Sequence, residues 1–135
     1  MKKMIDFSNN PLQSTQTQGN AMSISAIKTE YMIIRNSDYD ITINPRKPVG
    51  ILALRSDGEN VYIGTSFVAP QDNFNTKLGV IKATGRTNAK DAMVVPLNDT
   101  FNEVMHEKLL VIGLGASSRA HSFSEVFKKK VVDPR

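Results

Sequence analysis

The sequence predicts an α+β domain in which an antiparallel sheet packs against two or three helices. Short apolar runs with alternating residues lie between residues 31 and 68, which is typical of strands. Segments with apolar residues at helical spacing follow residue 72. Strands that precede helices favour an α+β domain over an alternating α/β sheet. We expect sheet residues within 31–68 and 93–97, helices over 73–84 and 99–110, and a third helix or an extended tail over 122–132.

The chain divides into an arm, a body and a tail. Residues 8–25 are rich in Ser, Thr, Asn and Gln, with few apolar residues at any period. Such a segment buries too little apolar surface to offset the entropy cost of ordering. We therefore predict a polar arm over 1–28, a single domain over 29–121 and a basic segment over 122–135. The arm either packs on its own body or contacts a protein partner or second subunit through residues 1–25.

Two segments before residue 48 are expected to be extended. Tyr31–Arg35 reads as a short strand, and Asn36, Ser37 and Asp38 supply turn chemistry after it. The next segment, 39–44, alternates, with Tyr39, Ile41 and Ile43 on one face.

A hairpin is predicted between two apolar runs, 49–55 and 61–68. Asp57 and Gly58 lie between them, and glycine accepts the positive φ that a tight hairpin turn requires. Val61, Ile63, Thr65 and Phe67 alternate as a half-buried strand should.

The first helix is expected to begin after Pro70, with Asp72 or Asn73 as its cap, and to run to Thr84. Gly85 is well placed to end it in a left-handed conformation. Apolar residues at i, i+4 and i+7 predict a buried stripe made of Phe74, Leu78 and Ile81. Gly79 lies away from this stripe, and its cost in a helix indicates close approach by another backbone, either a neighbouring strand or a ligand.

The second helix is expected to be capped by Asn98 or Asp99. Its apolar face consists of Phe101, Val104, Met105 and Leu109. Gly113 and Gly115 then end it. The run Val111–Ser118 faintly resembles a phosphate-binding glycine loop, but helix termination explains its glycines better.

One segment, Phe67–Arg86, carries a resemblance. A strand ending in Phe and Pro70 leads into Asp72-Asn-Phe74, then a lysine, a glycine and a closing Gly-Arg86. This arrangement resembles small, mostly uncharacterised bacteriophage-encoded proteins. The phage proteins that it resembles often carry more basic residues just after Asp-x-Phe, whereas this chain has Asn75 and Thr76 there. The resemblance implies a phage-type protein and says little about activity.

Basic residues make nucleic acid the first candidate partner. The chain has 17 Lys and Arg against 13 Asp and Glu, a formal charge of +4. The residues expected to contact phosphates are Lys77, Lys82, Arg86, Lys90, Lys128, Lys129 and Lys130. Arg86 is the best single candidate, because its planar fork can hold a phosphate with two bonds. The alternative is an ordinary amphipathic helix whose lysines are solvated.

Residues for catalysis or metal binding are few. The chain has no cysteine, so it has neither a disulfide nor a thiolate metal site. His106 and His121 have no other strong ligand at metal-binding spacing, and no Gly-x-Ser-x-Gly elbow occurs. We therefore expect no enzyme activity, no metal and no cofactor.

Three functions follow from these observations. The first is a non-enzymatic phage protein associated with nucleic acid. The second is a virion structural or assembly protein that uses its N-terminal arm for subunit contacts, and the third is a host-directed inhibitor. A membrane span needs about 20 apolar residues, and no apolar run in the sequence approaches that length. We therefore expect the protein in the host cytoplasm or, alternatively, in the virion.

Overall fold

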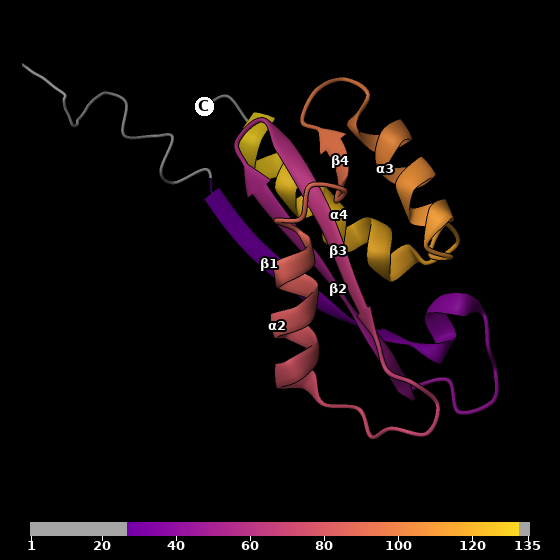
Figure 1. Ribbon diagram of the computed structural model, residues 1–135. Helices are drawn as coiled ribbons and strands as arrows, with labels where there is room; N and C mark the ends of the chain where they lie inside the picture. Colours follow the sequence, from indigo (N-terminus) through magenta and orange to yellow (C-terminus); the bar gives the residue numbers. More distant parts are fainter. Residues whose placement is uncertain (1–26, 133–135) are drawn as a thin grey trace, which may run out of the picture.

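The computed structural model describes residues 27–132, without the side chains of residues 27 and 129–132. A four-stranded antiparallel sheet, in the order β1-β2-β3-β4, forms its middle layer. The strands are β1 (Ile27–Arg35), β2 (Pro48–Asp57), β3 (Asn60–Phe67) and β4 (Met93–Pro96). Helix α2 (Thr76–Arg86) covers one face, and α3 (Phe101–Val111) and α4 (Ser118–Val132) cover the other (Figure 1). The predicted α+β class is confirmed, with the third helix present. The predicted arm lies outside the described residues except for its last two positions, 27 and 28, which belong to β1.

The predicted hairpin is confirmed as β2 and β3. The two strands pair from Ser56 opposite Val61 to Gly50 opposite Phe67. Gly58 adopts the expected positive φ of 95°. The Asp57 carboxylate fixes the turn, since it accepts hydrogen bonds from the N–H groups of Glu59 and Asn60, each at 2.9 Å. Its other oxygen accepts the hydroxyl of Tyr62 at 2.8 Å.

These contacts make the hairpin sensitive to acid. Burial opposes ionisation of Asp57, but hydrogen bonds from Glu59, Asn60 and Tyr62, with the nearby Arg55 charge, hold its pKa below the ordinary 3.8. A lowered folded-state pKa means that the carboxylate stabilises the fold above its unfolded pKa. That contribution is lost as the pH falls through the folded pKa. We expect Asp57→Asn to lower the free energy of unfolding by about 1 kcal/mol near neutral pH.

Denaturant titrations of the variant and the wild type across the acid range measure this effect. The difference between the two proteins should shrink as the pH falls from the unfolded-state pKa through the lower folded-state pKa of Asp57. A difference in the free energy of unfolding that stays constant with pH would contradict the stabilising role of the ionised Asp57 carboxylate.

The expectation of extended structure over 39–44 is wrong. Residues Asn36–Tyr39 form a short 3₁₀ helix, η1, and Asp40 follows it with a φ of 61°. The Asn36 side chain donates hydrogen bonds to the carbonyls of Ile43 at 3.3 Å and Asn44 at 3.1 Å, which closes the segment into a loop. The alternating isoleucines of this loop consequently face solvent, and Ile43 is 76% exposed.

The main core lies between the sheet and the pair α3 and α4. Alternate residues of the strands point into it, because side chains along a strand alternate between faces. Its buried members are Met32, Ile34, Leu52, Leu54, Val61, Ile63, Val95, Phe101, Met105, Leu109, Leu114, Ala120 and Phe127. The predicted apolar face of the second helix is therefore confirmed for Phe101, Met105 and Leu109, with Val104 partly buried against the same core.

The ends of α2 differ from the prediction. Asn75, and neither Asp72 nor Asn73, is the N-cap, and its side-chain oxygen accepts the N–H of Leu78 at 2.9 Å. Gly85 does not end the helix, which continues to Arg86 with Thr87 as a right-handed C-cap. The Thr87 hydroxyl supplies the terminating contact by donating to the Thr84 carbonyl at 2.6 Å. Glycine is therefore not required at this end.

The face that α2 turns toward the sheet also differs from the predicted stripe. Phe74 packs against the small cluster of Ile51, Ala53 and Ala83. Leu78 and Ile81 face away from the sheet and are 48% and 59% exposed. Gly79 is closely approached, but by a side chain of β2 and not by the expected backbone, because a Cβ added there would lie 2.8 Å from Cγ1 of Ile51. The contact face is thus built from small residues, which a search for large apolar residues does not find.

The boundaries of α3 and α4 also have local causes. Thr100, and neither Asn98 nor Asp99, is the N-cap of α3, and the Asn98 side chain accepts hydrogen bonds from the N–H of Thr100 at 2.9 Å and its hydroxyl at 2.7 Å. Gly113 follows α3 with a φ of 83°, as helix termination by this glycine predicts. Val111 is the last residue of α3, so no strand precedes the glycines and a phosphate loop is not formed. Helix α4 begins at Ser118, earlier than residue 122, because the Ser117 hydroxyl accepts the N–H of Ala120 at 3.1 Å.

Candidate binding surface on helix α2

Three predicted cationic residues lie on one helix. Lys77, Lys82 and Arg86 are all exposed side chains of α2. The helical repeat of 3.6 residues places them on both sides of the line from Leu78 through Ile81. Helix α2 has no acidic residue. Its outer face is therefore a stripe of two aliphatic side chains bordered by positive charge.

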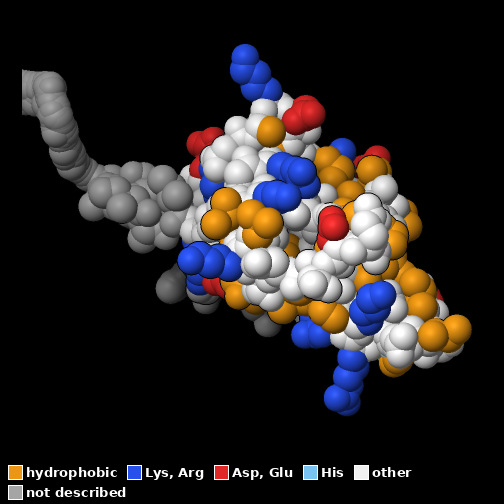
Figure 2. Space-filling view, turned by 60° about the horizontal axis from the view of Figure 1, so that its bottom comes forward, with side chains coloured by type: hydrophobic (Ala, Val, Ile, Leu, Met, Phe, Trp, Pro, Cys, Tyr) orange, Lys and Arg blue, Asp and Glu red, His pale blue; other side chains and the backbone are white. Residues whose placement is uncertain are grey.

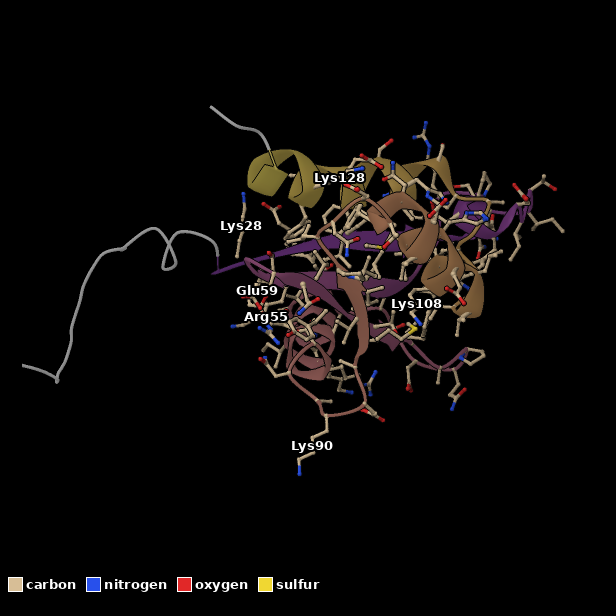
Figure 3. All side chains as sticks on the ribbon, turned by 90° about the horizontal axis from the view of Figure 1, so that it is seen from above. Lys28, Arg55, Glu59, Lys90, Lys108 and Lys128 are labelled. Atoms are coloured by element: carbon tan, nitrogen blue, oxygen red, sulfur yellow. The ribbon has the colours of Figure 1, made fainter. Side chains whose placement is uncertain are left out.

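The other predicted cations are distributed differently. Lys90 follows α2 in the turn before β4 and projects into solvent on the α2 side (Figure 3). Lys128 belongs to α4 and lies on the opposite side of the sheet (Figure 3). The side chains of Lys129 and Lys130 lie outside the described residues. The structure thus brings together the α2 cations and separates them from Lys128.

The α2 cations form no ion pair within the described part of the chain. Among the described residues, the ion pairs join Lys28 to Glu30 and Arg119 to Asp38, and none involves Lys77, Lys82 or Arg86. An exposed cation without a carboxylate neighbour breaks no ion pair when it binds a phosphate. This is the electrostatic requirement of an anion-binding surface.

Arg86 is held in a fixed position by the edge of the sheet. Pairing between β3 and β4 ends at Ile63 opposite Met93. Beyond that point the Thr65 carbonyl accepts a hydrogen bond from Nη1 of Arg86 at 2.5 Å. The side chain is still exposed, so the guanidinium is oriented by one bond while much of it faces solvent.

A groove of 380 Å³ adjoins this surface. It lies between the end of β3, the following loop and the first turns of α2. Its lining includes Phe67, Phe74 and Leu78 together with one acidic residue, Asp72, and one basic residue, Lys82. Phe67 is 49% exposed. Basic and hydrophobic side chains lie next to one another on the face shown in Figure 2. The groove therefore joins the end of β3, the following loop and the start of α2, all of which belong to the segment 67–86 that the sequence distinguishes.

Two histidines that are distant in sequence come together on the other layer. Nδ1 of His106 lies 3.5 Å from Nε2 of His121, and the rings stack with centroids 5.3 Å apart. Nε2 of His121 also lies 2.9 Å from the Gly115 carbonyl. Within residues 27–132, no group of three or more His, Cys, Asp or Glu is arranged to hold a metal ion.

A buried carboxylate, Asp38, joins η1 to the start of α4. It accepts hydrogen bonds from the Ser117 hydroxyl at 2.9 Å, Nη1 of Arg119 at 2.6 Å and the N–H of Arg35 at 2.8 Å. Burial, and then the Asp38 charge, raise the pKa of the neighbouring Tyr39. From the sequence, Asp38 is expected only as a turn residue. No local signal indicates that its side chain has partners at the start of α4. The cluster is internally satisfied, so it acts as a structural link rather than a binding site.

No protein-family model, curated protein or solved structure matches the chain significantly. None of the helices in the described part of the chain combines the length and the apolar character that a membrane span requires.

Proposed function

We propose that this chain is a non-enzymatic, phage-type binding protein that associates with nucleic acid through α2 and Lys90. The observation that carries the proposal is the outer face of α2, which presents Lys77, Lys82 and Arg86 without any acidic residue. A polymer with a phosphate at each residue can pair with several separate cations on such a face. The proposal places the protein in the host cytoplasm, where nucleic acid is accessible.

Binding to a labelled DNA duplex, followed by fluorescence anisotropy over a range of salt concentrations, tests this function. Changing both Lys77 and Lys82 to glutamine is expected to weaken binding at least about tenfold at low salt. It should also reduce the slope of log affinity against log salt by about one for each lysine that no longer neutralises a phosphate. A single-stranded RNA of equal length distinguishes the preferred nucleic acid.

Lys128→Gln is the matched control, because Lys128 lies on the opposite layer. It should leave the affinity and the salt slope of the wild type almost unchanged. Absence of binding by the wild type to either nucleic acid at low salt would exclude the proposal. An equal loss in the Lys128 variant would instead indicate a diffuse effect of net charge.

A second candidate function follows from the aliphatic side chains between the cations. Exposed Leu78 and Ile81 suit a protein partner, as a host-directed inhibitor requires. Changing both residues to serine should then abolish binding to a co-purified protein while binding to DNA is retained. A role in virion assembly is a third candidate, whose predicted contacts in residues 1–25 lie outside the described part of the chain.

A further inference from the structure

Strand β1 forms one edge of the sheet and has a side without a strand neighbour among the described residues. On its inner side it pairs with β2, from residue 27 opposite Asp57 to Ile34 opposite Gly50. The Ile33 carbonyl points outward, because Nη2 of Arg119 donates to it at 3.0 Å. Backbone groups alternate in direction along an antiparallel strand. The N–H and C=O groups of residues 27, Thr29 and Tyr31 therefore also point outward.

The two ends of this edge differ. Near the end of β1 the outward backbone groups already have partners. Arg119 donates a hydrogen bond to the Ile33 carbonyl, and the Asp38 carboxylate accepts one from the N–H of Arg35. At Thr29 and Tyr31 no such contact is made within residues 27–132. The Tyr31 side chain is 47% exposed beside this stretch. An open edge of this length is a template for pairing with another strand.

The charges along β1 are complementary to a second copy of the same strand. Lys28 and Glu30 lie on the same side of the strand, with Nζ and Oε2 separated by 2.9 Å. An antiparallel copy centred on Thr29 places each Lys28 opposite Glu30 of the second copy. Opposite charges in directly facing positions stabilise antiparallel pairs. A copy centred on Tyr31 would instead place Thr29 opposite Ile33, whose carbonyl already has Arg119 as its donor.

We propose that β1 pairs with β1 of a second copy, antiparallel and about a two-fold axis at Thr29. The hydrogen-bonded pairs are Thr29 with Thr29 and residue 27 with Tyr31, each using outward backbone groups. Lys28 and Glu30 of the two copies form a four-charge cluster on the α4 side of the sheet. The product is a symmetric dimer with one continuous sheet.

Three variants of the full chain test this dimer by light scattering after size-exclusion chromatography. The wild type should elute with the mass of a dimer. Thr29→Pro removes an outward N–H and leaves the pairing with β2 intact, so it should give a folded monomer with an unchanged circular dichroism spectrum. Lys28→Glu should raise the dissociation constant about tenfold, and adding Glu30→Lys should restore it.

Crosslinking tests the register independently. The chain has no cysteine, so Thr29→Cys introduces a single thiol at the two-fold axis. Facing residues of a hydrogen-bonded pair lie about 5.5 Å apart at Cα, within the range of a disulfide. Mild oxidation should convert this variant to a covalent dimer, and Thr42→Cys in the exposed loop should not crosslink. A monomeric wild type, or a Thr29→Pro variant that dimerises as well as the wild type, would overturn the proposal.

Discussion

Replacing Asp38 with alanine is expected to lower the free energy of unfolding by about 3 kcal/mol. The Asp38 side chain is 2% exposed and accepts hydrogen bonds from Ser117, Arg119 and the backbone of Arg35. Its removal leaves the buried Ser117 hydroxyl without its acceptor. Arg119 is 45% exposed and can turn to water, which limits the cost. Urea denaturation followed by circular dichroism measures the change.

Ser37→Ala provides the matched control, because Ser37 is the exposed neighbour of Asp38 in η1. Its effect should stay within about 0.5 kcal/mol. If Asp38→Ala were as mild as this control, the link between η1 and α4 would contribute little to stability. Arg119→Ala should fall between the two, since Ser117 and Arg35 still satisfy the carboxylate.

Adding a methyl group at Gly64 is expected to cost about 3 kcal/mol. Gly64 lies in β3 under the end of α2, and a Cβ there would overlap the carbonyl oxygen of Ala83. It would also lie 2.8 Å from the backbone nitrogen of Thr87. Both atoms belong to the backbone of the helix end, so α2 itself must move away from the sheet. Calorimetry or denaturant titration of Gly64→Ala measures this cost.

Gly85→Ala should change the free energy of unfolding in the opposite direction and stabilise the protein. Gly85 lies inside α2, and a Cβ added to it meets no atom within 4 Å. Alanine in an exposed helix is about 1 kcal/mol more favourable than glycine, so this variant should be more stable than the wild type. A tolerated Gly64→Ala would show that α2 is less tightly fixed on β3 than its contacts imply.

The sheet could be predicted from sequence where the signals are local. Asp57 and Gly58 specify the turn, and the alternation that follows correctly buries Val61 and Ile63. It fails farther along β3, where Phe67 is 49% exposed while Gly64 and Ser66 are buried. The same alternation misleads at Ile41 and Ile43, because the side chain of Asn36 closes that segment into a loop. The alternation of apolar residues over 39–44 does not include Asn36, so it cannot indicate the hydrogen bonds that this residue makes.

Helix α2 shows why its orientation could not be predicted. A search for large apolar residues places Leu78 and Ile81 against the sheet, yet the helix packs through Gly79 and Ala83. The reason lies in β3, where Gly64 leaves room for close approach of the helix backbone. Helix packing depends on the shape of the facing strand, which the helix sequence does not contain.

The candidate site was predictable in part. Exposure of Lys77 and Lys82 on one helix agrees with the sequence-based expectation, whereas Arg86, expected after the helix, is its last residue. The role of all three in binding stays a prediction. The bond between Arg86 and Thr65 has no signal in the sequence, because it depends on where β4 ends. The separation of Lys128 from α2 likewise follows from tertiary structure alone.

The open side of β1 and the placement of α2 have a joint consequence for avidity. The two-fold axis of an antiparallel strand pair is perpendicular to the sheet, so joined copies would carry both α2 helices on the same side. A polymer that reaches both helices would meet the second at a high effective concentration. Such bivalent attachment can exceed single-site affinity by about 10² to 10⁴ without any new contact. Short ligands, which reach only one helix, would gain nothing from it.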